Sequence, residues 1–118
     1  MSEFVEVSKV GELEDGAMRA IDVAGREILL ARVGDHYYAA DNRCPHMGAR
    51  LAEGSLQGTV VTCPRHGSQF DLNGGQVLRW LKGTGVTSAL AKVFKPPKGL
   101  VTHRVKVEGD TIMVEIQN

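Results

Sequence analysis

The chain has 118 residues and a mass of 12.8 kDa, which is enough for one ordinary domain and too little for a large multidomain enzyme. Fourteen Lys and Arg residues balance fourteen Asp and Glu residues, so the bulk charge does not favour nucleic acid or an anionic membrane as partner. There is no apolar run long enough to cross a bilayer, and the first residues show no secretory signal pattern. We therefore expect a single soluble, cytoplasmic domain over 1–118 that is a monomer.

Short strands separated by turns dominate the first two thirds of the chain, and helix signals are scarce. The Gly34-Asp35 pair and Asn73-Gly74-Gly75 indicate tight turns, because glycine accepts a positive φ. The predicted strands, in chain order, are a segment around Val5 and Val7, then 18–23, 28–33, 37–40, 60–62, 69–72 and 76–78.

The clearest strand pattern lies near the C-terminus, where apolar and polar residues alternate on both sides of the Glu108-Gly109-Asp110 turn. This pattern predicts an antiparallel hairpin with one buried face. The residues expected on that face are Val101, His103, Val105, Val107, Ile112, Val114 and Ile116. Together with fourteen glycines spread along the chain, it predicts an all-β fold, a small antiparallel sandwich or barrel. For residues 86–94, periodicity does not decide between helix and strand.

The two cysteines of the chain each have a histidine within three residues, in two short segments. The four side chains are Cys44, His46, Cys63 and His66. Two thiolates and two imidazoles form a donor set for a thiophilic metal centre. Gly48 and Gly67 follow closely after the histidines, so the backbone can turn there and direct its amides at a bound group.

Other interpretations of these residues are weaker. A structural Cys2His2 zinc site would use the same four donors, but zinc fingers space them differently and neither segment is followed by a clear finger helix. A disulfide between Cys44 and Cys63 would leave both neighbouring histidines unexplained. We expect His103 to be a buried, satisfied histidine and His36 a solvated loop residue, rather than metal ligands.

The paired motif resembles the Rieske [2Fe–2S] proteins. It is Cys-Pro-His-Met-Gly-Ala-Arg-Leu-x-x-Gly at 44–54, followed by Cys-Pro-Arg-His-Gly-Ser-x-Phe-Asp at 63–71. The resemblance covers residues 3 to about 81 and about 100 to 116, and the length and strand rhythm are similar to the small Rieske-type ferredoxins that feed electrons to oxygenases. It implies a cluster-binding subdomain over about 42–82, formed by two loops, and a possible insertion over about 83–99.

This resemblance also implies the ligands and the function. One [2Fe–2S] cluster per chain would have Cys44 and Cys63 on one iron and His46 and His66 on the other. The residues implied around it are Met47, Gly48, Pro64, Gly67 and Ser68, and no catalytic residue is implied. The protein would be a one-electron carrier that contacts a ferredoxin reductase and a terminal oxygenase, or a similar acceptor, only transiently. The alternatives are a small Rieske subunit of a nitrite-reductase-like assembly and a redox-sensing module.

The residues around the motif predict the reduction potential. Rieske subunits of quinol-oxidising complexes have an extra cysteine in each loop, and these two form a disulfide; this chain has Ala49 and Arg65 there. Ser68 matches their hydrogen-bonding serine, whereas Phe70 replaces a tyrosine and has no hydroxyl to donate. We predict a potential in the lower half of the Rieske range of roughly −150 to +300 mV. A redox titration that places it near the top of this range would contradict the prediction.

Overall fold

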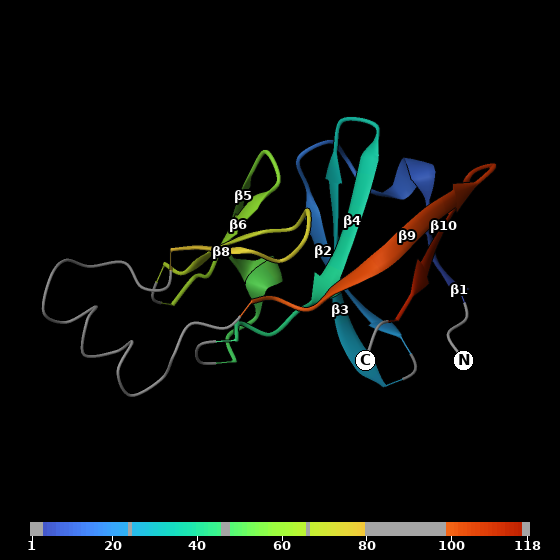
Figure 1. Cartoon of the computed structure of the whole chain (residues 1–118). Helices are drawn as coiled ribbons and strands as arrows, with labels where there is room; N and C mark the ends of the chain where they lie inside the picture. The colour runs from blue at the N-terminus through green and yellow to red at the C-terminus, as the bar shows by residue number, and fades with distance from the viewer. Residues whose placement is uncertain (1–3, 24, 46–47, 66, 80–98, 117–118) are drawn as a thin grey trace, which may run out of the picture.

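The computed structural model describes residues 4–23, 25–45, 48–65, 67–79 and 99–116, and within these ranges the strands form two antiparallel sheets (Figure 1). The larger sheet has the order β1-β10-β9-β4-β3-β2 and the smaller one β5-β6-β7-β8. The two edge strands β1 and β2 also contact each other, so the larger sheet nearly closes into a barrel. Among the described residues, no helix is long and apolar enough to span a membrane.

The strands of the larger sheet are β1 (Phe4–Lys9), β2 (Met18–Val23), β3 (Arg26–Val33), β4 (His36–Asp41), β9 (Thr102–Glu108) and β10 (Thr111–Glu115). Those of the smaller sheet are β5 (Ser55–Gln57), β6 (Val60–Thr62), β7 (Gln69–Asp71) and β8 (Val77–Arg79). Two short 3-10 helices, η1 (Val10–Glu12) and η2 (Leu51–Glu53), precede β2 and β5.

Strand β3 connects the two hydrophobic cores, because successive side chains of a strand point to opposite faces. Ile28 and Leu30 pack in the core of the barrel-like sheet, with Ile112 and Val114 of β10. Leu29 and Ala31 belong instead to the core beneath the smaller sheet. The continuous apolar run at 28–31 is thus buried on both sides, and the larger sheet supports the small one directly.

The all-β fold class predicted from the sequence is confirmed, and the strands at 18–23 and 60–62 match to the residue. The C-terminal hairpin is also confirmed, but the expected burial of its whole apolar row is wrong. Val101 and Val107 remain 38% and 44% exposed. Val101 precedes β9, and Val107 lies well past Thr102 and His103, where β9 pairs with β4. The two 3-10 helices and β5 were not predicted, and the possible insertion at 83–99 falls almost wholly outside the described residues.

The turn between β7 and β8 is hydrogen-bonded to the segment just before β9 and so connects the smaller sheet to the larger one. Gly75 donates its N–H to the Asp71 carbonyl (2.7 Å) and accepts from the N–H of Leu100 (2.8 Å). Its φ is 82°, and a Cβ placed there would lie 2.0 Å from the Leu100 carbonyl oxygen. Only glycine allows this approach, which explains the Asn73-Gly74-Gly75 pattern of the predicted turn.

Candidate metal centre

The first cysteine begins a tight loop at the end of the segment that follows β4. Cys44 donates its backbone N–H to the Ala49 carbonyl (2.8 Å), and its own carbonyl accepts from the N–H of Gly48 (2.8 Å). Gly48 has a φ of 76°, a conformation that most side chains disfavour. These bonds bring the backbone of Gly48 and Ala49 back against Cys44.

The second cysteine begins a loop with the same backbone pattern. Cys63 donates its N–H to the Ser68 carbonyl (2.8 Å) and accepts from the N–H of Gly67 (3.2 Å). Gly67 has a φ of 74°, nearly the value found at the corresponding glycine of the first loop. The described residues of the two loops therefore share one backbone arrangement.

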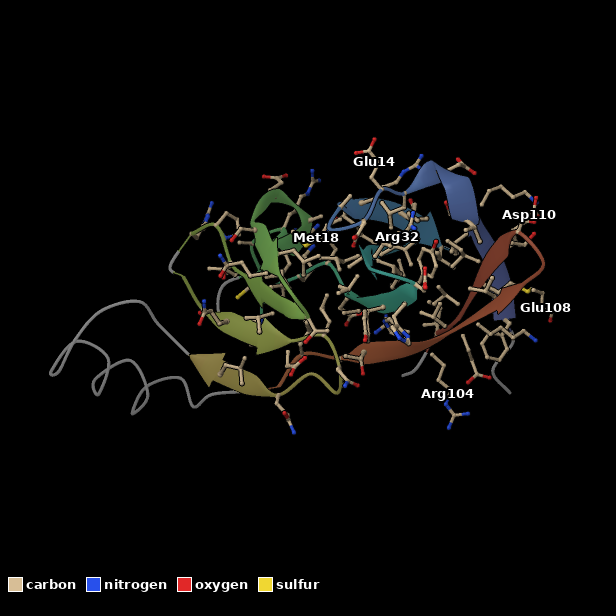
Figure 2. The ribbon with its side chains drawn as sticks, turned by 90° about the horizontal axis from the view of Figure 1, so that it is seen from above. Glu14, Met18, Arg32, Arg104, Glu108 and Asp110 are labelled. Carbon is tan, nitrogen blue, oxygen red and sulfur yellow. The ribbon has the colours of Figure 1, made fainter. Side chains whose placement is uncertain are left out.

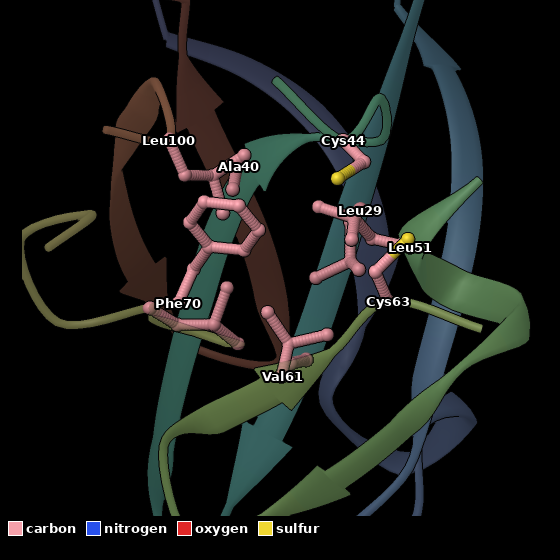
Figure 3. Packing of buried hydrophobic residues seen from close by; sticks show 10 residues of the cluster. Leu29, Ala40, Cys44, Leu51, Val61, Cys63, Phe70 and Leu100 are labelled. Atoms are coloured by element: carbon pink, nitrogen blue, oxygen red, sulfur yellow. The ribbon is translucent and has the colours of Figure 1, made fainter. Parts of the chain in front are cut away.

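Both thiols lie in the same buried cluster, which lies beneath the smaller sheet (Figure 3). Cys44 is 2% exposed and Cys63 is 3% exposed, and both are free cysteines rather than a disulfide. The side chains packed around them include Leu29, Leu51 and Phe70, each fully buried. Both thiols therefore belong to one apolar cluster and are almost completely shielded from water.

His46, His66 and Met47 lie outside the described residues, so the place of the predicted imidazole ligands stays a prediction. Of the predicted neighbours, Ser68 is fully buried directly after the second loop and Pro64 is exposed. No cluster of three or more His, Cys, Asp or Glu side chains suited to a metal occurs within the described ranges, from which two of the four predicted donors are missing.

Of the other two histidines, His103 is buried as expected, and His36 is exposed as expected but belongs to a strand rather than a loop. His103 is buried, and its Nε2 lies 2.9 Å from Oδ1 of Asp41. Asp41 is also held by Arg26, with two contacts of 3.2 Å. His103 therefore belongs to a polar network that joins β9 to β4 and to the start of β3. His36 is exposed at the start of β4.

A buried asparagine that sequence reasoning missed anchors the first loop. Asn42 is fully buried, two residues before Cys44. Its Nδ2 donates to Oε1 of Glu27 (3.0 Å), and its Oδ1 accepts from the N–H of Ala52 (2.7 Å). One side chain thus ties the segment before the first loop and the helix after it to β3. The spacing of the motif gave no signal for this role, since Asn42 precedes the motif.

Replacing Asn42 by alanine is expected to lower the free energy of unfolding by about 1–2 kcal/mol, because a fully buried side chain is truncated and the partly buried N–H of Ala52 and carboxylate of Glu27 each lose a partner. The matched control is Asn73→Ala, since Asn73 is exposed. Urea unfolding of both variants tests this: equal stability would show that the Asn42 bonds contribute nothing.

A second missed feature holds the two loops together. Gly54 follows η2, and a Cβ built on it would lie 1.9 Å from the Thr62 carbonyl oxygen and 3.2 Å from Cδ of Pro64. The exit from the first loop therefore passes directly against the entry to the second. In the sequence Gly54 is only the last residue of the first motif, whereas the structure shows that a glycine is needed there for a backbone contact.

The space between the loops is a pocket of about 460 Å³. Its described lining is Arg43, Gly48, Ala49, Arg50, Glu53, Pro64 and Arg65. Ala49 and Arg65, the two positions where a disulfide brace would be expected in quinol-oxidising relatives, both line it. Here the loops are joined instead by the packing of Gly54 and by the shared core.

Residues 3–88 match a family model described as the Rieske [2Fe–2S] domain. The chain belongs to the Rieske [2Fe–2S] domain family. It is 30% identical over 113 residues to the ferredoxin component of the naphthalene 1,2-dioxygenase system of Pseudomonas aeruginosa, covering 96% of this chain and 95% of that one. It is 40% identical over 75 residues to the ferredoxin component of the alkene monooxygenase system of Xanthobacter autotrophicus, covering 63% and 62%.

A solved structure of a ferredoxin has the same fold as this Rieske domain. The ferredoxin of carbazole 1,9a-dioxygenase from Nocardioides aromaticivorans superposes with a TM-score of 0.76 and 28% identity, covering 94% of this chain and 95% of that one.

The described residues fit the [2Fe–2S] cluster of the family. The two thiols are buried, unoxidised and presented by loops of the same design, which suits ligands of one binuclear group. The whole chain has only two cysteines, so a cluster held within one chain needs two ligands of another kind. In this Rieske domain both loops also have described residues at the surface, namely Gly48, Pro64 and Arg65.

Proposed function

We propose that this Rieske domain is a one-electron carrier that receives electrons from a ferredoxin reductase and passes them to a terminal oxygenase or a similar acceptor. The observation that supports this best is the pair of equivalent cysteine loops, whose thiols share one buried cluster while Gly48, Pro64 and Arg65 of the same loops are exposed. A redox group held there is shielded from water yet lies close to a docking partner. The relatives named as ferredoxin components of oxygenase systems support the same function.

In this proposal Cys44 and Cys63 bind one iron, and His46 and His66 bind the other. The cluster, when bound, supplies a reversible one-electron oxidation and reduction. The chain itself provides the rest: Leu51 and its neighbours exclude water around the thiols, and Ser68 lies fully buried next to the second loop. Leu51 is fully buried, so it covers the centre rather than taking part in a surface contact.

The proposal also covers the oligomeric state, the location in the cell and the redox partners. The chain acts as a single domain over 1–118, as a monomer in the cytoplasm, and no residue of its own performs catalysis on a substrate. A solved complex of reduced oxygenase and oxidised ferredoxin in carbazole 1,9a-dioxygenase, whose matching chain is 26% identical, supports an oxygenase as the acceptor. Contacts with both partners are expected to be brief and small, as is usual for electron-transfer encounters.

The experiment is an elemental and reductive titration of the purified protein. We expect about two irons and two acid-labile sulfides per chain, and bleaching of the visible absorption that is complete after one electron per chain. The protein should stay folded and monomeric when no partner is present, which a subunit dependent on its assembly would not. A colourless protein with one tightly bound zinc would overturn the electron-carrier function and leave a structural module.

A further inference from the structure

Three arginines surround the surface end of the two cysteine loops. Arg43 directly precedes the first cysteine, Arg50 follows the first loop, and Arg65 lies within the second loop. All three are exposed and line the same pocket between the loops. Cationic groups from both halves of the site therefore converge on the face where an electron would leave.

The acidic residues nearby neutralise this charge only in part. Arg50 lies 3.5 Å from Glu27 and 3.8 Å from Glu53. Arg43 donates to the carbonyl of Gly48 (3.3 Å), and within the described residues no carboxylate lies in ion-pair range of Arg43. Three guanidinium groups thus face two carboxylates, which leaves a formal charge of +1.

Arg65, like Arg43, has no described carboxylate in ion-pair range.

At the far end of the larger sheet, in contrast, the cationic side chains have carboxylate partners. There Arg104 lies 3.7 Å from Glu115, and Lys106 lies 2.8 Å from Glu108. Figure 2 shows Arg104, Glu108 and Asp110 at this end, remote from the smaller sheet. Because the chain has a formal net charge of zero, an excess of positive charge at the loops is balanced elsewhere on the molecule.

We propose that Arg43, Arg50 and Arg65 form a cationic docking rim, which selects a redox partner protein whose contact face presents carboxylates. The inference rests on the proposed function, since it supposes that electrons leave at the loops. Guanidinium groups pair with carboxylates through two parallel hydrogen bonds, so exposed arginines around a pocket fit such a face. Charge complementarity of this kind acts mainly on the rate of association, by factors of roughly 10 to 1,000 at low salt.

The test uses two protein acceptors that share one redox centre and differ in surface charge. These are native cytochrome c, whose surface is rich in lysine, and the same protein with its lysines converted to carboxylates by succinylation. Oxidation of the dithionite-reduced holoprotein is followed by stopped flow at low and high ionic strength. With the succinylated acceptor, the rate is expected to fall as salt rises, because the attraction is screened. With native cytochrome c, we expect the opposite dependence.

The variants are Arg43→Gln and the double variant Arg43→Gln/Arg65→Gln. With the succinylated acceptor at low salt, the double variant should react roughly 3- to 10-fold more slowly than the unmodified protein and lose most of its salt dependence. Arg104→Gln is the matched control, since it removes the same charge from an exposed side chain at the far end, and its rate should stay unchanged. The visible spectrum of each variant must first show a full cluster content.

If Arg65→Gln disturbs the loop and loses the cluster, Arg43→Gln alone carries the test, with a slowing of about 2-fold expected. Rates that do not change in variants with an intact cluster would overturn the docking rim and leave the electron-carrier function standing. Faster reaction with native cytochrome c than with the succinylated form, rising as salt falls, would also overturn it. A protein without any cluster would instead contradict the proposed function itself.

Discussion

Replacing either Cys44 or Cys63 by alanine is expected to abolish the [2Fe–2S] cluster. The chain has only these two cysteines, and both are buried in one core at the base of matching loops. An alanine has no group that can bind iron, so one iron would lose half of its protein ligands. Iron and sulfide analysis after anaerobic purification should find almost none of either, and the visible absorption should be missing.

Pro64→Ala is the matched control for these variants. Pro64 directly follows the second cysteine and is exposed, and no role as a ligand is proposed for it. This variant should keep its full content of iron and sulfide. If a cysteine variant kept a cluster that is reduced and reoxidised normally, the two loops would not be the binding site.

Gly54→Ala is expected to destabilise the domain by about 3 kcal/mol or more, a large share of the roughly 5–15 kcal/mol typical for a domain. The added Cβ would lie 1.9 Å from the backbone oxygen of Thr62. A backbone carbonyl in a strand cannot move aside as a flexible side chain can, so the two cysteine loops would have to separate. We therefore expect both a lower urea midpoint and a loss of cluster on storage.

The control is Gly11→Ala, where a Cβ would meet nothing within 4 Å and φ is not positive. This change should leave the urea midpoint almost unaltered. Equal stability of the Gly54→Ala and Gly11→Ala variants would show that the close approach of the two loops can relax without cost, and that Gly54 does not hold them together.

Most strands could be predicted because their signals are local. The strand at Met18–Val23 ends at a glycine-containing turn, and Val60–Thr62 is a β-branched stretch just before the second cysteine. Local patterns also gave the hairpin at the C-terminus. Local patterns did not predict how deeply each residue is buried. The exposure of Val107, for example, depends on which strands pair beside it. That is a property of the assembled sheets.

In the candidate site, too, features with a local sequence signal could be predicted and features that depend on distant contacts could not. Spacing alone pointed to Cys44 and Cys63, because metal ligands on short loops leave a local pattern. The roles of Asn42 and Gly54 could not be predicted, since each depends on a contact with a segment distant in the sequence, β3 for Asn42 and the second loop for Gly54. That Arg43 and Arg65 have no described carboxylate in ion-pair range was hidden for the same reason. A net charge of zero does not reveal which cations have carboxylates beside them.

The most direct test of a cluster with mixed cysteine and histidine ligands is pulsed electron paramagnetic resonance of the reduced protein, labelled with ¹⁵N only in histidine. We predict strong couplings to two inequivalent histidine nitrogens, and the loss of one of them in His46→Ala or His66→Ala where a paramagnetic cluster remains. His36→Ala, which changes an exposed histidine, should retain both couplings. A reduced protein with no strongly coupled histidine nitrogen would contradict the assignment of the two loops as a Rieske centre.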